Sequence, residues 1–188
     1  MFEKFRLWWR FDGRYMHREF ARGVKNLWRW FPVIWRDRDW DQDFIYSILA
    51  KKLEFQAKYI GDRDWHVVAK RDAEIMRLVV KLIRLQQEDF YGMEYMDYEE
   101  TKVWFEPCND TSETYELKSE TISEQYDAYF AKYPLQYKRV LNGEGFLNRE
   151  IDPTDKHLIA MSIAHLNQDR CKELLFKIIS DHIDGWWD

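Results

Sequence analysis

Apolar residues recur at helical spacing through most of this chain, and this pattern constrains the fold more than any other feature. Pro32 is expected to end the first helix and Gly61 the second. Ser123 is expected to cap the fourth helix, which Pro134 kinks or divides. The sequence predicts a mainly α, single-domain bundle of about five helices over residues 1–188, with helices at about 15–31, 41–60, 64–90, 123–141 and 154–184.

The helical period disappears between Gly92 and Thr121. Residues 102–106 and 115–118 are expected to form two short strands joined by a polar connection. This acidic insertion, residues 92–121, therefore predicts a small β-hairpin near residues 101–118. Because an isolated hairpin is marginal in water, it must pack on the helices or on another chain.

Charged and aromatic residues are unevenly distributed. The net charge is −5, whereas a protein that binds extended nucleic acid through a basic surface is expected to be positively charged. Residues 1–40 nevertheless form a basic aromatic N-terminal segment, with ten basic and five acidic residues and six of the ten Trp. Residues 88–124 carry twelve acids against two lysines. Such a division allows the two regions to attract each other, a second copy or two different partners.

The cysteines and the lengths of the apolar runs constrain the expected cellular location. Cys108 and Cys171 form no CxxC motif or dense disulfide framework, which favours a reducing compartment. No apolar run resembles a secretory signal or reaches the roughly 18 residues of a membrane span. A cytoplasmic protein is expected, although an amphipathic first segment lying on an anionic membrane stays an alternative.

The tetrad Asp-Arg-Asp-Trp occurs twice, at 37–40 and 62–65, each time before an expected helix. One interpretation is a pair of helix caps. The other is a pocket for a planar anionic ligand, in which Arg pairs with phosphate and indole stacks on a base. A cationic ridge of Arg6, Arg10, Arg14, Arg18 and Arg22, at four-residue spacing, completes such a site across a subunit boundary or is simply a solvated helix face. The candidate ligand-binding residues are Trp35, Arg36, Arg38 and Trp40, with Arg14, Arg18 and Arg22 of the ridge.

Catalytic signals are thin, so no catalytic residue, metal or cofactor is expected and an enzyme is disfavoured. The sequence contains no phosphate-binding glycine loop and no HExxH motif, and the histidines are expected to be structural or on the surface. Two DxxD pairs, Asp152 with Asp155 and Asp181 with Asp184, match poorly the ExxE and ExxD helices of MazG-type pyrophosphatases. A metal-dependent all-α nucleotide hydrolase is therefore the weakest alternative.

Two segments resemble a group of small proteins encoded by tailed bacteriophages. One is Trp30-Phe31-Pro32-Val33-Ile34-Trp35, followed by Arg38-Asp39-Trp40-Asp41 and Lys51-Lys52-Leu53; the other is Leu174-Leu175-Phe176-Lys177-Ile178-Ile179, closing on Trp186-Trp187-Asp188. The resemblance covers residues 28–90 and 155–188 and leaves the hairpin out. It implies phage origin and expression in the bacterial cytoplasm, and carries no catalytic assignment.

Phage origin favours a protein that counters host defence. The leading hypothesis is a non-enzymatic homo-oligomer that sequesters a phosphorylated, nucleotide-derived immune signal at subunit boundaries. The alternative is a protein-interaction module that inhibits or redirects a host protein, docking through the acidic aromatic region from Tyr95 to Leu117.

Overall fold

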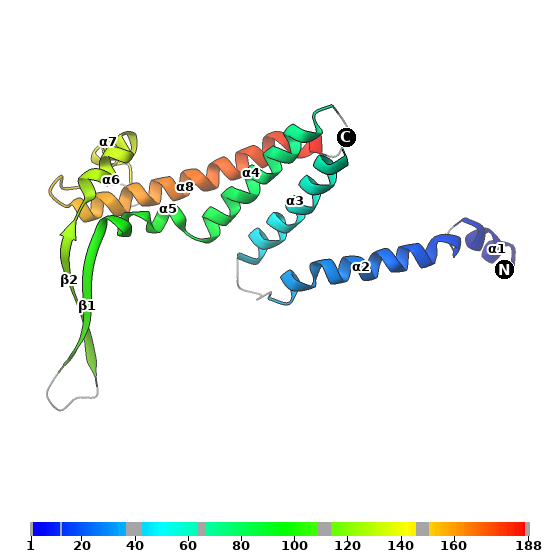
Figure 1. Ribbon diagram of the computed structural model, residues 1–188, viewed down its shortest axis with the longest axis horizontal. Helices are drawn as coiled ribbons and strands as arrows, with labels where there is room; N and C mark the ends of the chain where they lie inside the picture. Colours follow the sequence, from blue (N-terminus) through cyan, green and yellow to red (C-terminus); the bar gives the residue numbers. More distant parts are fainter. Residues whose placement is uncertain are drawn as a thin grey trace. The chain divides into compact units, whose positions relative to one another are not determined.

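The computed structural model describes residues 2–11, 13–36, 43–63, 67–108, 114–145 and 151–186. These residues are mainly helical with one antiparallel pair of strands, which confirms the mainly α class and the small hairpin (Figure 1). The prediction of about five helices is wrong, because the described residues form eight α-helices and three short 3₁₀ helices. In order, the elements are α1 Phe2–Phe11, η1 Gly13–Tyr15, α2 Met16–Ile34, α3 Asp43–Arg63, α4 Ala69–Gln87, α5 Phe90–Met93, η2 Glu94–Tyr98, β1 Glu99–Pro107, β2 Tyr115–Glu124, α6 Tyr126–Lys132, α7 Pro134–Leu141, α8 Lys156–His182 and η3 Ile183–Trp186.

The chain divides into two compact units, residues 1–52 and residues 53–188. Their boundary falls inside α3, so one continuous helix belongs to both units. The single-domain organisation therefore stays a prediction. Within the described residues, no helix is both long and apolar enough to cross a membrane.

In the N-terminal unit, a 3₁₀ turn separates α1 from α2. A Cβ on Gly13 would lie 2.7 Å from the Trp9 ring, so the turn needs glycine where the indole approaches the backbone. The break interrupts the expected cationic ridge, because Arg10 belongs to α1 and Arg18 to α2. The ridge is therefore discontinuous, and α1 lies outside the five expected helices.

Helix α2 passes through Pro32 and ends at Ile34, so the prediction that Pro32 stops this helix is wrong. Proline removes the bond to the carbonyl of Trp28 and its ring crowds that carbonyl, and just two helical residues follow it. The backbone amide of Trp35 then closes the helix by donating to the carbonyl of Phe31 at 2.9 Å. The helix therefore ends within one turn after the proline.

Gly61 lies inside α3, and the prediction that it ends the second helix is also wrong. A Cβ at this position would lie 3.1 Å from the Cβ of Ala73 in α4. Glycine therefore permits the close approach of α3 and α4. The expected helix at 64–90 is shorter than predicted, because the left-handed backbone of Asp89, with φ of 48°, separates α4 from α5.

Helix α8 covers most of the expected range 154–184 and lies beside α4 in the larger unit (Figure 1). Asp155 caps its start, with a carboxylate oxygen accepting from the backbone amide of Leu158 at 3.0 Å. Aromatic and aliphatic side chains from α6, α7 and α8 fill the core at its N-terminal end. The buried members are Tyr126, Tyr129, Phe130, Val140, Ile151, Ile159, Ala160 and Ile163.

The expected helix at 123–141 is replaced by a strand end and two helices. Ser123 belongs to β2, so the prediction that it caps a helix is wrong. Pro134 occupies the first position of α7 and separates it from α6, as the alternative of a divided helix anticipated. The helices begin at Tyr126 because the strand continues through Glu124.

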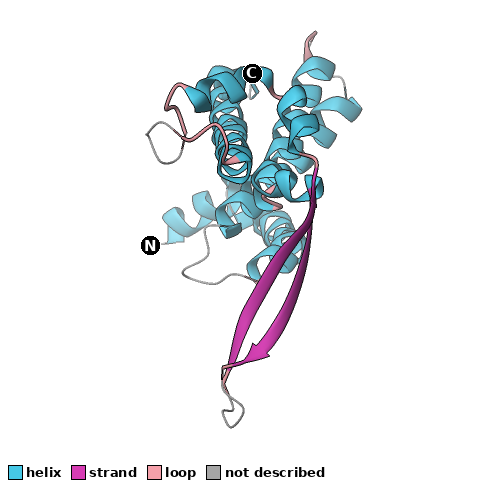
Figure 2. Cartoon of the chain, turned by 90° about the vertical axis from the view of Figure 1, so that its left-hand side faces the viewer, coloured by secondary structure: helices cyan, strands magenta, loops and turns pink. Residues whose placement is uncertain are grey.

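Strands β1 and β2 form an antiparallel hairpin that is longer than predicted. Phe105 lies directly opposite Leu117, and Val103 lies opposite Ser119. A register shift between Glu100 and Thr101 marks the base. The hairpin extends as an arm from the helices next to it (Figure 2), and its base lies beside α6 and the start of α8 in Figure 1.

Candidate functional site

The two faces of the hairpin differ in chemistry. Because side chains alternate along a strand, one face gathers apolar residues that lie opposite one another. Phe105 is 70% exposed and its partner Leu117 is 59% exposed. We call this set the hairpin apolar face; it consists of Val103, Phe105, Pro107, Tyr115 and Leu117, all exposed.

The opposite face of the hairpin is mainly charged, with Trp104 as an exposed apolar residue opposite Lys118. Glu106 lies directly opposite Glu116, an unfavourable pairing that Lys118 offsets by approaching Glu116 to 2.8 Å. The two strands together contain six Glu and two Lys, a net charge of −4. A binding surface with Lys or Arg around its edge would therefore be electrostatically complementary to this hairpin.

The hairpin lies outside the helical core along most of its length. Every residue from Glu100 to Cys108 is exposed. In a two-stranded sheet each strand also keeps one edge free for pairing. Apolar side chains and free strand edges are costly to leave in water, and exposed surfaces of this kind are typical of sites where another molecule binds.

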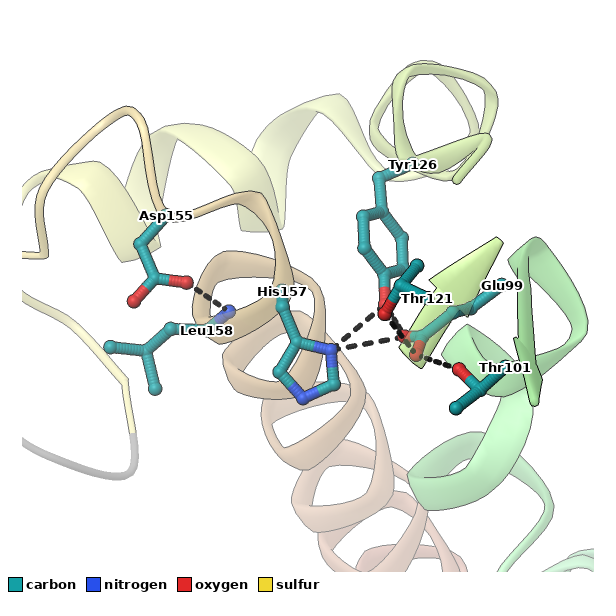
Figure 3. Close-up of polar contacts among 7 residues, drawn as sticks. All are labelled: Glu99, Thr101, Thr121, Tyr126, Asp155, His157 and Leu158. Atoms are coloured by element: carbon teal, nitrogen blue, oxygen red, sulfur yellow. Dashed lines mark hydrogen bonds and ion pairs between the residues drawn. The ribbon is translucent and has the colours of Figure 1, made fainter. Parts of the chain in front are cut away.

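A polar cluster fixes the base of the hairpin to the helices (Figure 3). Glu99 of β1 accepts hydrogen bonds from Thr101 and from the hydroxyl of Tyr126 in α6. The Nδ1 atom of His157 in α8 lies 2.9 Å from that hydroxyl and 3.1 Å from Glu99 Oε2. Thr121 of β2 donates to the same carboxylate at 3.4 Å. One carboxylate thus joins both strands to α6 and α8.

The electrostatics of this cluster favour anchoring over catalysis. Hydrogen bonds from Thr101 and Tyr126, with a further contribution from His157, lower the pKa of Glu99. Burial, together with the bond to Glu99, raises the pKa of Tyr126. The carboxylate therefore stays ionised and the phenol stays protonated, which makes Tyr126 a donor and a poor base or nucleophile.

A second anchor lies beside it in η2. The carboxylate of Glu94 is buried, accepts from the Tyr133 hydroxyl at 2.7 Å and pairs with Lys132. The bond from Lys132 to Glu94 raises the pKa of Lys132. Burial and Glu94 raise the pKa of Tyr133. This pair ties η2, which leads into β1, to the junction of α6 and α7.

A pocket of about 400 Å³ opens next to the second anchor. Its wall is mainly apolar, with cationic groups from Lys132 and Arg170 and side-chain amides from Gln136 and Asn167. Its other lining residues are Leu82, Tyr91, Tyr133, Pro134, Leu135, Cys171 and Leu174. The size and lining suit a small ligand that carries an anionic group.

The predicted ligand-binding residues fall in the N-terminal unit. Trp35 closes α2 and is 76% exposed, and Arg36 follows it at the surface. Arg18 lies over the Tyr15 ring at 5.7 Å, and Arg22 pairs with Glu19 at 3.2 Å. The backbone of Arg14 is in η1; the Arg14 side chain, Arg38 and Trp40 lie outside the described residues.

Helix geometry keeps the two halves of this predicted site apart in one chain. Arg22 and Trp35 are thirteen residues apart on α2, about 20 Å at the helical rise. A mononucleotide is shorter than that distance, so it does not bridge Trp35 and Arg22 of one copy. Within one copy, Arg22 therefore does not complete the site predicted around Trp35 and Arg36, and its completion across a subunit boundary stays a prediction.

The remaining sequence candidates have structural partners. Asp152 accepts from the amide and hydroxyl of Thr154, and Asp155 caps α8. Asp181 pairs with Lys177 at 3.0 Å. The first Asp-Arg-Asp-Trp tetrad lies outside the described residues, and Asp62 of the second lies inside α3. Among described residues, no group of three His, Cys, Asp or Glu side chains is placed to hold a metal ion.

The anchor around Glu99 had no sequence signal. Glu99 and His157 are 58 positions apart, and the first precedes the predicted strand while the second lies on a predicted helix. Only the longer β1, which begins at Glu99, brings this carboxylate to the start of α8.

Comparisons of the chain with family models, with curated proteins and with solved structures gave no match.

Proposed function

We propose that this protein is a non-catalytic interaction module whose hairpin docks on another protein. The observation that carries the proposal is the hairpin apolar face, which is exposed on an arm whose base is attached to the helices by the Glu99 and Glu94 anchors. An arm that is fixed at its base loses little further freedom when its tip binds, which favours affinity.

The chemistry of the arm defines the partner. Phe105 and Leu117 supply apolar contact area, and the excess of Glu on both strands favours a partner groove bordered by Lys or Arg. A partner strand that adds to a free edge of the hairpin would satisfy backbone groups at the same time. The resemblance of the sequence to phage proteins supports a host protein of the bacterial cytoplasm as this partner.

Affinity capture from bacterial lysate tests the proposal when paired variants are compared. The full-length protein is expected to retain one partner, and the double variant Phe105→Gln with Leu117→Gln is expected to lose it. The matched control makes the same substitutions on α2, Phe31→Gln with Leu27→Gln, and is expected to retain it. Equal retention by the hairpin variant, or equal loss by both variants, would contradict docking through the arm.

The sequestration of a phosphorylated nucleotide-type ligand is a second candidate, favoured by the pocket between α7 and α8. Arg170 supplies a guanidinium for phosphate, and Tyr91 and Tyr133 supply rings for stacking. The proposed homo-oligomer offers another route, since Trp35 of one copy and Arg22 of a second copy are then free to share a ligand.

Calorimetric titration with cyclic and linear nucleotides tests this second function. Binding lost in Arg170→Ala and retained in Arg36→Ala would place the ligand in the pocket, whereas the reverse would support the α2 site. An absence of binding tighter than about 0.1 mM, roughly 5.5 kcal/mol, would exclude both. Turnover of a bound nucleotide in the presence of magnesium or manganese would contradict a non-catalytic role.

A further inference from the structure

Helix α2 has two chemically opposite faces. Its apolar positions include Phe20, Leu27, Trp28 and Phe31, with Trp35 directly after its last residue, and these span an arc of about 100° on a helical projection. The side chains of Phe20 and Trp28 are each 74% exposed, and none of the residues of α2 is buried. An apolar surface of this size on a helix requires an occupant.

The aromatic residues of this face form a continuous cluster. The ring centroids of Trp28 and Phe31 are 6.2 Å apart, and those of Phe31 and Trp35 are 5.1 Å apart. Indole and phenyl side chains are the groups that concentrate at the boundary between lipid headgroups and acyl chains. The composition of the face therefore matches a lipid interface.

The polar face of α2 is cationic. Arg18, Arg22, Lys25 and Arg29 recur at spacings of three and four residues and fall within an arc of about 60° opposite the apolar face. Glu19 is the only acidic residue in α2. Long cationic side chains on such a helix reach the headgroup phosphates while the apolar side is buried in the bilayer.

We propose that α2 lies in the surface of an anionic phospholipid bilayer, parallel to it. Its nineteen residues cover about 28 Å, and its apolar side contacts acyl chains while its cationic side faces the headgroups. An anionic membrane surface complements the cationic face of α2, whereas an apolar partner helix would contact only the apolar face. The apolar arc is also wider than the two-position seam of a coiled coil, which disfavours a second copy as the occupant.

Vesicle co-sedimentation of the full-length protein tests this proposal. The probes are vesicles of phosphatidylcholine containing 30 mol% phosphatidylserine and vesicles of phosphatidylcholine alone. We expect binding to the anionic vesicles that is at least tenfold tighter than binding to the neutral ones and that weakens in 0.5 M salt. Leu27→Gln with Phe31→Gln should reduce binding at least tenfold, and Arg22→Glu with Arg29→Glu should remove the preference for anionic lipid.

The matched control carries the same Leu→Gln and Phe→Gln substitutions on the hairpin, at Leu117 and Phe105, and should bind vesicles like the wild type. Equal loss in both variants would overturn the proposal, as would equal affinity for neutral and anionic vesicles. Absence of vesicle binding would also overturn it. In that case, sedimentation velocity that shows a dimer dissociated by Leu27→Gln with Phe31→Gln would identify a second copy as the occupant.

Discussion

The Nδ1 atom of His157 lies 3.1 Å from Oε2 of Glu99, which joins the start of α8 to the first residue of β1. The Tyr126 hydroxyl donates its hydrogen bond to the same carboxylate. In this arrangement the Nδ1 atom of His157 acts as a hydrogen-bond donor. This contact determines where the hairpin leaves the helices. The stability of the arm should therefore depend on the ionisation of Glu99.

Replacement of Glu99 by Gln should destabilise the protein in a pH-dependent way. The pKa of Glu99 lies below its usual 4.5, so its stabilising contribution is complete above pH 4.5 and disappears as the pH falls through the lowered value. We expect Glu99→Gln to cost about 2 kcal/mol at pH 7 and progressively less as the pH falls below 4.5, measured by urea unfolding. Glu100→Gln on the adjacent exposed side chain is the control, and a constant difference across this pH range would contradict the prediction.

Two buried tyrosines of α6 should respond differently to loss of their hydroxyls. Tyr126→Phe removes a donor to Glu99 and is expected to cost about 1.5 kcal/mol. The Tyr129 hydroxyl is buried without a hydrogen-bond partner among the described residues. Burial raises the pKa of Tyr129, and the nearby Asn167 amide partly offsets this rise but lies outside hydrogen-bonding geometry. Tyr129→Phe is therefore expected to be neutral or slightly stabilising. Thermal unfolding that ranks the two variants in the opposite order would refute this assignment.

The buried carboxylate of Glu94 should matter more than an exposed one in a similar ion pair. Glu94→Gln weakens the bonds from Tyr133 and Lys132 in a desolvated site and is expected to cost about 2 kcal/mol. The control is Glu144→Gln, which removes an exposed pair with Arg139 and is expected to cost less than about 0.5 kcal/mol. Similar unfolding midpoints for the two variants would count against a structural role for Glu94.

The two cysteines should differ in reactivity. Cys108 is exposed, whereas Cys171 is buried in the pocket wall and burial raises its pKa. In folded protein at pH 8, we expect one thiol to react rapidly with a disulfide reagent and the second to react only after denaturant is added. Cys108→Ser should abolish the rapid phase and Cys171→Ser should leave it intact; rapid reaction of both thiols would show that the pocket wall is open.

The sequence predicts the elements whose signals are local. The apolar residues at helical spacing identify most of α8, and the two short runs at 102–106 and 115–118, which flank a polar connection, identify the hairpin. The helix ends predicted at Pro32 and Gly61 are wrong. Pro32 falls in the last turn of α2, two residues before its end, and Gly61 makes room for Ala73 of the neighbouring helix. The continuation of β2 past Lys118 has no local signal, because Ser, Glu and Thr are as compatible with a cap as with a strand.

The candidate site was only partly foreseeable for the same reason. The hypothesis of an acidic aromatic docking region follows from composition, and the exposure of Phe105 and Leu117 defines the face that this hypothesis proposes. The Glu99 cluster and the Glu94 pair depend on contacts between elements that are distant in sequence. The ligand site predicted around Trp35, Arg36, Arg38 and Trp40 stays a prediction, because Arg38 and Trp40 lie outside the described residues.

Site-specific photo-crosslinking tests the docking of the hairpin most directly. A photoreactive phenylalanine analogue replaces Phe105 in the full-length protein, and the control carries it at Phe90, which is exposed on α5. In bacterial lysate, the analogue at position 105 should give one discrete crosslinked protein that disappears with Leu117→Gln, and the analogue at position 90 should not. No discrete adduct at position 105, or the same adduct from both positions, would contradict the proposal that the hairpin is the interaction arm.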